Sequence, residues 1–178
     1  MPNRDRLARR ASIVRAKRAD WWGLMHPRKW SFDNEPRILS KFFAGEGGFA
    51  GDYDASYVPV MGHIWLPKHR LTAIRRNTLS LQEVLAAYVA VFNSTPFVRL
   101  LELFSPHVAG GQFDLSSRHV GLMPIPDLHE LSMDIDRGRL VSELAKSGRT
   151  IDLADENWRS HNNQLVTALY GTRIISEI

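Results

Sequence analysis

A cluster of basic side chains between residues 68 and 76 contains no acidic residue. It comprises Lys68, His69, Arg70, Arg75 and Arg76. Amines and guanidinium groups at this density neutralise phosphates, and phosphate contacts supply most of the non-specific affinity of proteins for DNA. The sequence therefore predicts that this connector contacts the DNA backbone.

Seven further polar residues have side chains that suit base edges or nearby phosphates. Three precede a glycine-rich stretch and four follow the double glycine at residues 110–111: Arg28, Lys29, Lys41, Gln112, Ser116, Ser117 and Arg118. Arginine and lysine pair with guanine edges, and glutamine pairs with adenine. We expect these residues to reach a groove of DNA. One alternative stays open, in which Arg118 pairs with Asp114 or caps a carbonyl.

The glycine-rich stretch at residues 45–50 fits the G-x-G-x-x-A pattern of a dinucleotide-binding loop. Such a loop must open a helix whose amide groups hold the pyrophosphate. Gly51, Asp52, Asp54 and Pro59 follow instead, and they disfavour a helix. We therefore interpret the stretch as a glycine hairpin loop near the DNA.

Residues suited to hydrolysis or metal binding lack the spacing that those reactions need. A metal-dependent nuclease uses clustered carboxylates with a nearby lysine, but Lys146 stands one position too late after Glu143 for the usual E-x-K arrangement. Asp127 and Glu130 are interpreted as helix-start charges. The chain has no cysteine, and its seven histidines never occur at metal-ligand spacing. No catalytic residue and no metal site are predicted.

The composition is typical of a globular protein. Hydrophobic residues make up 44% of the 178, with five Trp and eight Phe, and domains commonly have about 100–150 residues. The absence of cysteine excludes disulfides, and no signal-peptide or membrane-spanning pattern occurs. We expect a soluble cytoplasmic protein with no membrane partner.

Charge is divided unevenly along the chain. Residues 1–99 hold 16 Lys and Arg against 8 Asp and Glu, whereas residues 100–178 hold 7 against 11. This division is typical of a protein that presents one face to a polyanion and another to solvent or a protein partner.

The most basic run is Arg4 to Arg18, with seven Lys or Arg in 15 residues. Its apolar residues recur at helical spacing, so residues 1–20 are interpreted as a basic N-terminal helix or linker that also touches phosphate. A dedicated phosphate-binding helix and a disordered basic arm are the alternatives.

Short β-prone runs at Arg37–Phe43, Tyr57–Met61 and His63–Leu66 predict a small antiparallel sheet. A capping box, Ser80 with Glu83, predicts a helix with one apolar face. Further helices are predicted from near Pro96, from 133 to 147 and from 153 to 170, the last two closed by Gly148 and Gly171. The predicted fold class is α+β, a small antiparallel sheet flanked by helices, preceded by the basic helix and followed by two C-terminal helices.

The most informative pattern spans Tyr88 to Pro126. An apolar helix runs into Phe92-Asn93-Ser94, and a glycine turn leads to Leu115-Ser116-Ser117-Arg118 and Met123-Pro124-Ile125-Pro126. This order resembles the C-terminal target-recognition, or specificity, domain of TaqI-like adenine-specific DNA methyltransferases of type II restriction-modification systems. Shorter pieces from Trp21-Trp22 to Trp65-Leu66-Pro67-Lys68 follow the same order, so the resemblance covers roughly residues 21–128.

The resemblance implies that residues 21–178 form a DNA target-recognition domain. Two departures matter, since Val91-Phe92 stands where the family usually has leucine and the methyltransferase half is missing. No Asn-Pro-Pro-Tyr or Asp-Pro-Pro-Tyr loop and no glycine loop fit for S-adenosylmethionine occur here. The resemblance thus implies a chain that is non-catalytic on its own, with S-adenosylmethionine held by the missing catalytic domain.

Two functions remain after this comparison. The first is sequence-specific recognition of double-stranded DNA, as a fragment or separate subunit that works with a methyltransferase catalytic domain or subunit in restriction-modification or phage defence. The alternative is a protein-interaction subunit of a phage-defence complex, whose acidic helices dock a partner and whose DNA contact is incidental.

Overall fold

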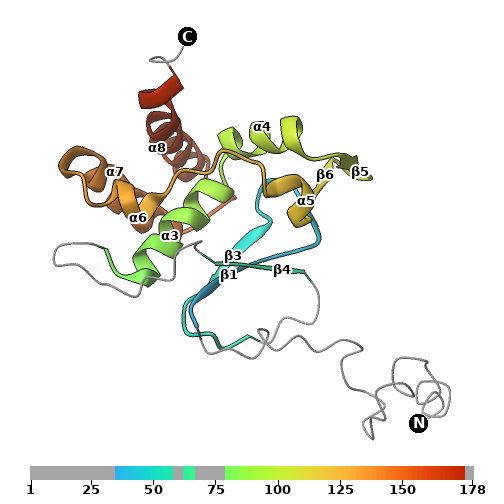
Figure 1. The fold of residues 1–178 in the computed structure, drawn as a ribbon, viewed down its shortest axis with the longest axis horizontal. Coiled ribbons are helices and arrows are strands. Elements are labelled where there is room, and N and C mark those ends of the chain that lie inside the picture. Colours follow the sequence, from blue (N-terminus) through green and yellow to red (C-terminus); the bar gives the residue numbers. More distant parts are fainter. Residues whose placement is uncertain (1–34, 58–61, 67–78, 175–178) are drawn as a thin grey trace, which may run out of the picture. The chain divides into compact units, whose positions relative to one another are not determined.

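The computed structural model describes residues 35–57, 62–66 and 79–174, without the side chains of 172–174. These residues belong to one compact unit, residues 34–178. Its strands are β1 (Arg37–Ser40), β2 (Phe43–Ala44), β3 (Phe49–Asp52), β4 (His63–Trp65), β5 (His107–Val108) and β6 (Gln112–Asp114). Its helices are α3 (Leu81–Phe92), α4 (Thr95–Phe104), α5 (Ser117–Val120), α6 (Leu128–Leu131), α7 (Ile135–Arg149) and α8 (Glu156–Ile174). The fold is α+β, as predicted (Figure 1).

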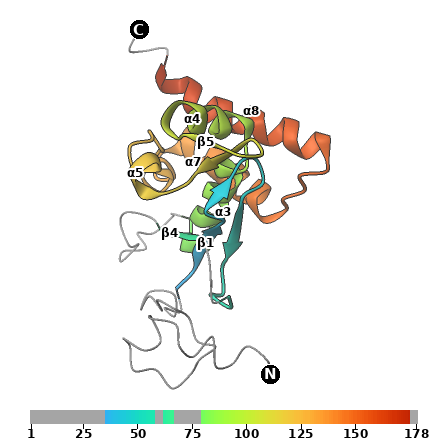
Figure 2. The same cartoon turned by 90° about the vertical axis from the view of Figure 1, so that its right-hand side faces the viewer.

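Within the described residues the strands form two antiparallel sheets rather than the single one predicted. The first has the order β3-β1-β4 and the second β2-β6-β5. In both views the second sheet lies at the α4–α5 end of the fold (Figures 1 and 2). The predicted strand Arg37–Phe43 is broken, because β1 ends at Ser40 and β2 pairs with β6, far along the chain. No local pattern in residues 37–43 could indicate such a distant partner.

Of the short strands in the described residues, β4 was predicted from the sequence, whereas β3, β5 and β6 were not. The prediction for His63–Leu66 is confirmed by β4, whose Ile64 pairs with Leu39 of β1. Strands β3, β5 and β6 were not predicted, because they have two to four residues and β3 contains Gly and Asp, which are poor strand formers. Tyr57 is not in a strand, and the rest of the predicted Tyr57–Met61 strand lies outside the described residues.

The helix α3 begins where the sequence predicts. The Ser80 hydroxyl accepts from the backbone N–H of Glu83, and the Glu83 carboxylate accepts from the backbone N–H of Ser80, so the capping box is confirmed. The Ser80 hydroxyl also donates to the Glu83 carboxylate over 2.7 Å, and this bond, followed by the one from the Ser80 N–H, holds the pKa of Glu83 below its ordinary value. The next helix, α4, has Pro96 in its first turn, as predicted, and Ser94 as its cap.

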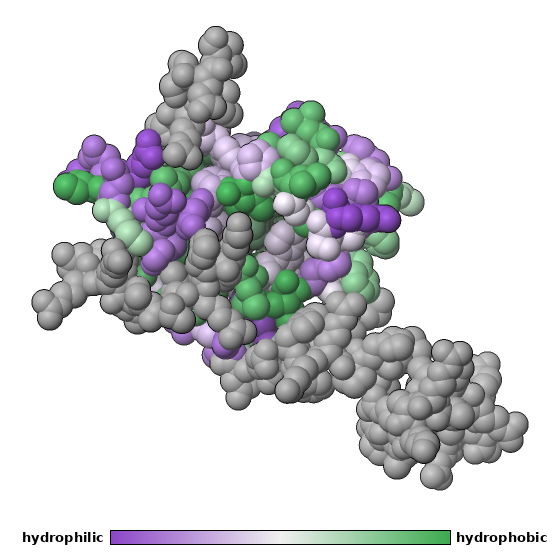
Figure 3. All heavy atoms as spheres, viewed as in Figure 1, coloured by the Kyte–Doolittle hydropathy of each residue, from purple (hydrophilic) through white to green (hydrophobic). Residues whose placement is uncertain are grey.

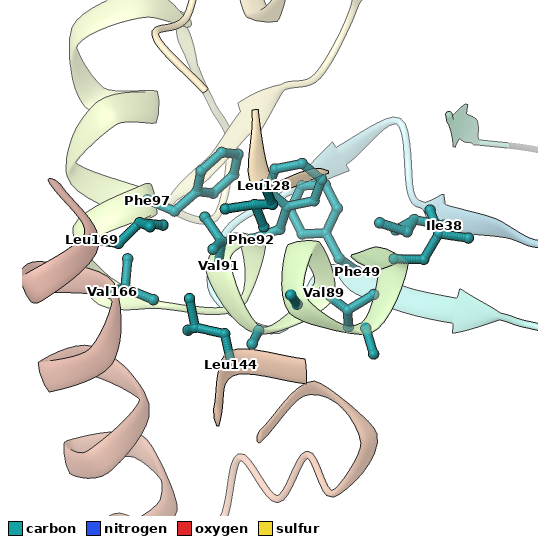
Figure 4. Close-up of a cluster of buried hydrophobic side chains, with 14 of the residues drawn as sticks. Ile38, Phe49, Val89, Val91, Phe92, Phe97, Leu128, Leu144, Val166 and Leu169 are labelled. Carbon is teal, nitrogen blue, oxygen red and sulfur yellow. The ribbon is translucent and has the colours of Figure 1, made fainter. Parts of the chain in front are cut away.

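The core is built around α3, which lies between the first sheet and α7 (Figure 1). Eight of its twelve residues are buried, on more than the single face predicted, because α4, α6, α7, α8 and both β1 and β3 contact it. The rings of Phe49, Phe92 and Phe97 meet at its C-terminal end, with centroids 4.8–5.6 Å apart (Figure 4). Such aromatic contacts add to the stabilisation from buried area.

The two C-terminal helices are confirmed, but their predicted ends are wrong. Gly148 lies inside α7 and Gly171 inside α8. Gly148 is a contact residue, since a Cβ there would overlap the carbonyl oxygen of Ala86 on α3 and lie 3.1 Å from the backbone nitrogen of Ala90. The glycine therefore allows close packing of two helices rather than ending one of them.

Two buried asparagines connect the helices to their neighbours. The Asn93 side chain donates to the carbonyl of Phe49 over 2.9 Å and accepts from its N–H over 3.3 Å, which links the end of α3 to β3. The Asn162 side chain donates to the carbonyl of Ala90 and accepts from the Ser147 hydroxyl, both over 2.9 Å. Asn162 thus joins α8 to α3 and α7. The predicted helix at residues 1–20 lies outside the described residues, and the proposed boundary at residue 21 stays a prediction.

We expect Gly148→Ala to lower the free energy of unfolding by about 2 kcal/mol, because the added methyl forces α7 away from α3. The matched control is Gly171→Ala, where a Cβ meets no atom within 4 Å, and replacing glycine inside a helix stabilises by up to about 1 kcal/mol. Urea denaturation of both variants measures the difference. Equal effects of the two substitutions would contradict the close packing of α7 against α3 at Gly148.

Candidate nucleic-acid interface

The outer face of the second sheet collects several of the predicted DNA-contacting residues. Phe43 pairs with Asp114 and Ala44 with Phe113 across β2 and β6. Ala44, Phe113 and Leu115 are buried, and side chains alternate between the faces of a strand. The opposite face therefore carries Phe43, Gln112 and Asp114, and we call it the outer face.

Lys41 lies at the same end of this face as residues 116–118. The N–H of Leu115 donates to the carbonyl of Phe42 over 3.1 Å, which continues the β2–β6 pairing by one residue. Lys41 and Ser116 are the next residues of the two segments, just beyond this last hydrogen bond. Two predicted groups that are distant in the sequence, Lys41 and Ser116-Ser117-Arg118, thus lie near the same end of the sheet. The Ser116 hydroxyl, however, is buried and has no hydrogen-bond partner, so it does not face a ligand. Lys41, Ser117 and Arg118 are exposed.

Two glycine turns meet at the other end of the sheet. A Cβ on Gly45 would lie 3.4 Å from the carbonyl oxygen of Gly111, so the turn after β2 lies beside the turn that joins β5 to β6. Gly110 and Gly111 have φ of 80° and 70°, a conformation that favours glycine. Gln112, which is exposed, directly follows this turn. The backbone of these two exposed glycines is therefore accessible to a ligand, beside Gln112, which was predicted to contact bases.

The side chain of Arg118 forms an ion pair with Asp114, which was one of the alternatives predicted for it. Its Nη2 lies 3.2 Å from Oδ2 of Asp114, and its Nε donates to Nε2 of His119 over 2.9 Å. The side chain is nevertheless 74% exposed, so its remaining N–H groups face solvent. An exposed pair of this kind is weak, and the guanidinium stays available to a stronger anion.

Asp114 is the one acidic residue among those assigned to the outer face. Its carboxylate accepts first from the backbone N–H of Ser116, over 2.8 Å, and then from Arg118. These hydrogen bonds and the positive charge of Arg118 hold the pKa of Asp114 below its ordinary value. The carboxylate therefore stays negative at neutral pH and reduces the local positive charge.

Two aromatic residues beside Lys41 were missed as site candidates. Phe42 and Phe43 are 41% and 46% exposed, and the ring of Phe42 meets the His63 ring edge-on with centroids 5.1 Å apart. In the sequence they read as the end of a buried strand. Their adjacency to a lysine was the only signal that could have indicated a surface role.

Seven predicted DNA-contacting residues lie outside the described residues. They are Arg28, Lys29, Lys68, His69, Arg70, Arg75 and Arg76. Their contact with DNA stays a prediction.

The two motifs that gave the family resemblance have structural roles in the described part of the chain. Asn93 joins α3 to β3, and the Ser94 hydroxyl accepts from the Phe97 N–H to begin α4. The Tyr88 hydroxyl donates to the carbonyl of Pro126 over 3.0 Å and accepts from the N–H of Leu128 over 3.1 Å. The two ends of the Tyr88–Pro126 stretch are therefore tied together, and burial raises the pKa of Tyr88.

The residues considered for cofactor binding and hydrolysis have structural positions in the described part of the chain. Residues 49–52 form β3, not a helix, so the glycine stretch before them has no helix N-terminus to offer a pyrophosphate. Asp127 caps α6 by accepting from the N–H groups of His129 and Glu130. Glu143 pairs with Lys146 over 2.6 Å on the exposed side of α7. Within the described ranges, no three His, Asp or Glu residues are grouped so as to hold a metal ion.

An apolar groove of about 410 Å³ lies between the first sheet, α3 and the segment that follows α5. Ile38, Trp65, Tyr88 and Ile125 line it, and Asp127 and His129 add polar groups. Its edge includes Leu66, the last described residue before the gap at 67–78. None of the five described DNA-contacting candidates lines the groove, so it is separate from the outer face.

Among the described helices, none is by itself long and apolar enough to cross a membrane. α3 and α4 together meet that length and apolarity, but they are bent by 71° at their junction.

Comparison of the sequence with protein-family models and with curated proteins finds no match. The site therefore rests on the residues and geometry described above.

The Asp114 carboxyl is expected to titrate below the ordinary aspartate value when followed by NMR. In the Arg118→Gln variant the pKa of Asp114 should rise only slightly, because the hydrogen bond from the Ser116 N–H, which lowers this pKa the most, remains. A return to the ordinary value in that variant would show that Arg118 dominates instead. Because the folded pKa is lowered, any stability that Asp114 contributes is present at neutral pH and is lost as pH falls through that pKa.

Proposed function

We propose that this chain is a sequence-specific double-stranded DNA recognition module of an adenine-specific, S-adenosylmethionine-dependent DNA methyltransferase or restriction-modification system. The observation that supports the proposal most is the convergence of Lys41 with Ser117 and Arg118 at one end of the outer face, with Gln112 at the other. Two separate sequence segments thereby share one polar surface.

The residues of the outer face divide into two chemical classes. Lys41 and Arg118 are cations that suit phosphates or guanine edges, while Gln112 and Ser117 have both donors and acceptors. Among the described residues no acidic side chain pairs with Lys41. Arg118 would exchange Asp114 for a phosphate or base, as an exposed and weak ion pair allows.

The catalytic role belongs in this proposal to a partner domain or subunit. That partner would hold S-adenosylmethionine and the flipped adenine, because an enzyme acting on a base must take it out of the stack. The present chain would bind the duplex beside that base and select the sequence. This part rests on the family resemblance of residues 21–128.

A protein-interaction subunit is the second candidate function. Hydrophobic residues reach the surface of the described part of the chain (Figure 3), among them Ile135, Leu122 and Leu103, which are 78–80% exposed. The acidic balance of residues 100–178 would suit a basic partner. Salt-dependent binding to duplex DNA separates the two functions.

We expect the chain to bind a random-sequence duplex at about micromolar concentration, with an affinity that falls steeply as salt rises. Lys41→Ala with Arg118→Ala should reduce the slope of log affinity against log salt by about 2, one for each phosphate that is no longer neutralised. Changing Lys68, Arg70, Arg75 and Arg76 together to alanine should reduce the slope further. Fluorescence anisotropy at several salt concentrations measures all three proteins.

The matched control is Arg139→Ala with Lys146→Ala, which removes the same charge from exposed positions on α7. This variant should bind like the unchanged chain. If the chain does not bind duplex DNA at low salt, the proposal is wrong and partner docking takes its place.

Asp114→Asn is expected to strengthen duplex binding several-fold. The amide oxygen can still accept from the Ser116 N–H, while the negative charge beside Arg118 is removed. Asp136→Asn, at an exposed position in the first turn of α7, is the comparison for the change in net charge alone. An equal gain in both variants would argue against contact at the outer face.

A further inference from the structure

His119 lies beside both members of the ion pair between Asp114 and Arg118. Its Nε2 accepts a hydrogen bond from Nε of Arg118 over 2.9 Å and lies 3.7 Å from Oδ2 of Asp114. The Nη2 of Arg118 lies 3.2 Å from the same carboxylate oxygen. One carboxylate oxygen is therefore within reach of two side chains, an arginine that is always charged and a histidine that can gain a charge.

The hydrogen bond between Arg118 and His119 requires a neutral imidazole. A neutral imidazole has one nitrogen that accepts, whereas both nitrogens of a protonated imidazole donate. Once His119 is protonated, the Nε–H of Arg118 faces another donor and two positive charges are adjacent. Protonation therefore breaks this hydrogen bond and gives the imidazole an N–H that needs an acceptor. Asp114 Oδ2 is such an acceptor, because only a small movement separates it from Nε2.

The elements beside His119 add few other charges in the described part of the chain. Asp114, on β6, has a pKa held below its ordinary value, first by a hydrogen bond from the backbone, so it stays ionised near neutral pH. Helix α4 packs against α5 and carries Arg99 and Glu102, which pair with each other over 3.0 Å. Lys41 adds a cation from the segment that precedes β2. The competition for the Asp114 carboxylate is thus between Arg118 and His119.

We propose that protonation of His119 moves the Asp114 carboxylate from Arg118 to the imidazolium and so frees Arg118 to bind DNA. An exposed ion pair is weak, so one added charge is enough to change which cation the carboxylate holds. The freed guanidinium, whose side chain is 74% exposed, then binds a phosphate or a guanine edge. His119 is a positioning residue that acts through Arg118.

This inference rests on the proposed DNA-binding function and adds a regulation of the same site by pH. If DNA binds the protonated form better, binding takes up a proton, and the affinity rises as the pH falls. Histidines gain their proton near pH 6.5. The outer face therefore binds duplex DNA more tightly on the acidic side of neutrality.

The test measures binding of the full chain to one random-sequence duplex by fluorescence anisotropy, at constant salt, on both sides of about pH 6.5. We expect several-fold tighter binding on the acidic side. This gain should disappear in His119→Gln, because glutamine gains no proton, and in Arg118→Ala, because no guanidinium remains to be freed. The matched control is His161→Gln, at an exposed position on α8, which should keep the gain.

The Asp114→Asn variant gives a second reading that leaves the histidine unchanged. Without the carboxylate, Arg118 is free on both sides of the titration. This variant should therefore bind on the alkaline side about as tightly as the unchanged chain binds on the acidic side, and acid should strengthen its binding much less. The two gains are not additive because each of them frees the same arginine.

The outcomes distinguish the pH switch from the function on which it rests. An acid gain that survives Arg118→Ala shows that the imidazolium meets DNA directly, and one that survives His119→Gln or is lost equally in His161→Gln belongs to other groups. Any of these results, or an affinity that does not change with pH, overturns the switch and leaves the DNA-binding proposal standing. Failure to bind the duplex at low salt at any pH overturns both.

Discussion

The close crossing of α3 and α7 is the constraint on which the described fold depends. Gly148 of α7 lies against the carbonyl of Ala86, where no side chain fits, and Ala86 and Ala90 of α3 are fully buried. Small residues on both helices let their backbones approach, so the facing sides of both helices are buried. Asn162 then fixes α8 to this pair through Ala90 and Ser147.

The outer face is positioned by this helical core through residues 92–94. Asn93 binds both backbone groups of Phe49 and so fixes β3, which pairs with β1, the strand that leads to Lys41 and β2. Ser94 begins α4, the helix that leads to β5 and β6. Neighbouring residues at one helix end therefore act on both segments of the outer face, Asn93 through a contact with β3 and Ser94 by beginning α4. The Phe92-Asn93-Ser94 motif can therefore position the outer face without itself contacting a ligand.

Local chemistry explains which elements the sequence could predict. The Ser80–Glu83 box, Pro96 and the apolar spacing of α7 and α8 act within one or two turns, and the structure contains all four helices. The break after Ser40 and the burial of Gly148 depend on partners far along the chain. For the same reason the sequence suggested Lys41 and Ser116–Arg118 as separate groups, and only the pairing of Leu115 with Phe42 joins them.

The charges of the outer face suit discrimination between DNA sequences better than tight binding to DNA of any sequence. Lys41 and Arg118 are opposed by Asp114, whose lowered pKa keeps it ionised, so the net charge of these three residues is small. Phosphate contacts hold a protein on DNA, but they carry little sequence information, which comes from base edges and from the shape of the duplex. In the proposed function, the basic connector at residues 68–76 supplies the general affinity. The outer face then adds the contacts that differ between sequences, and its acidic residue penalises any duplex that offers Arg118 nothing better than Asp114.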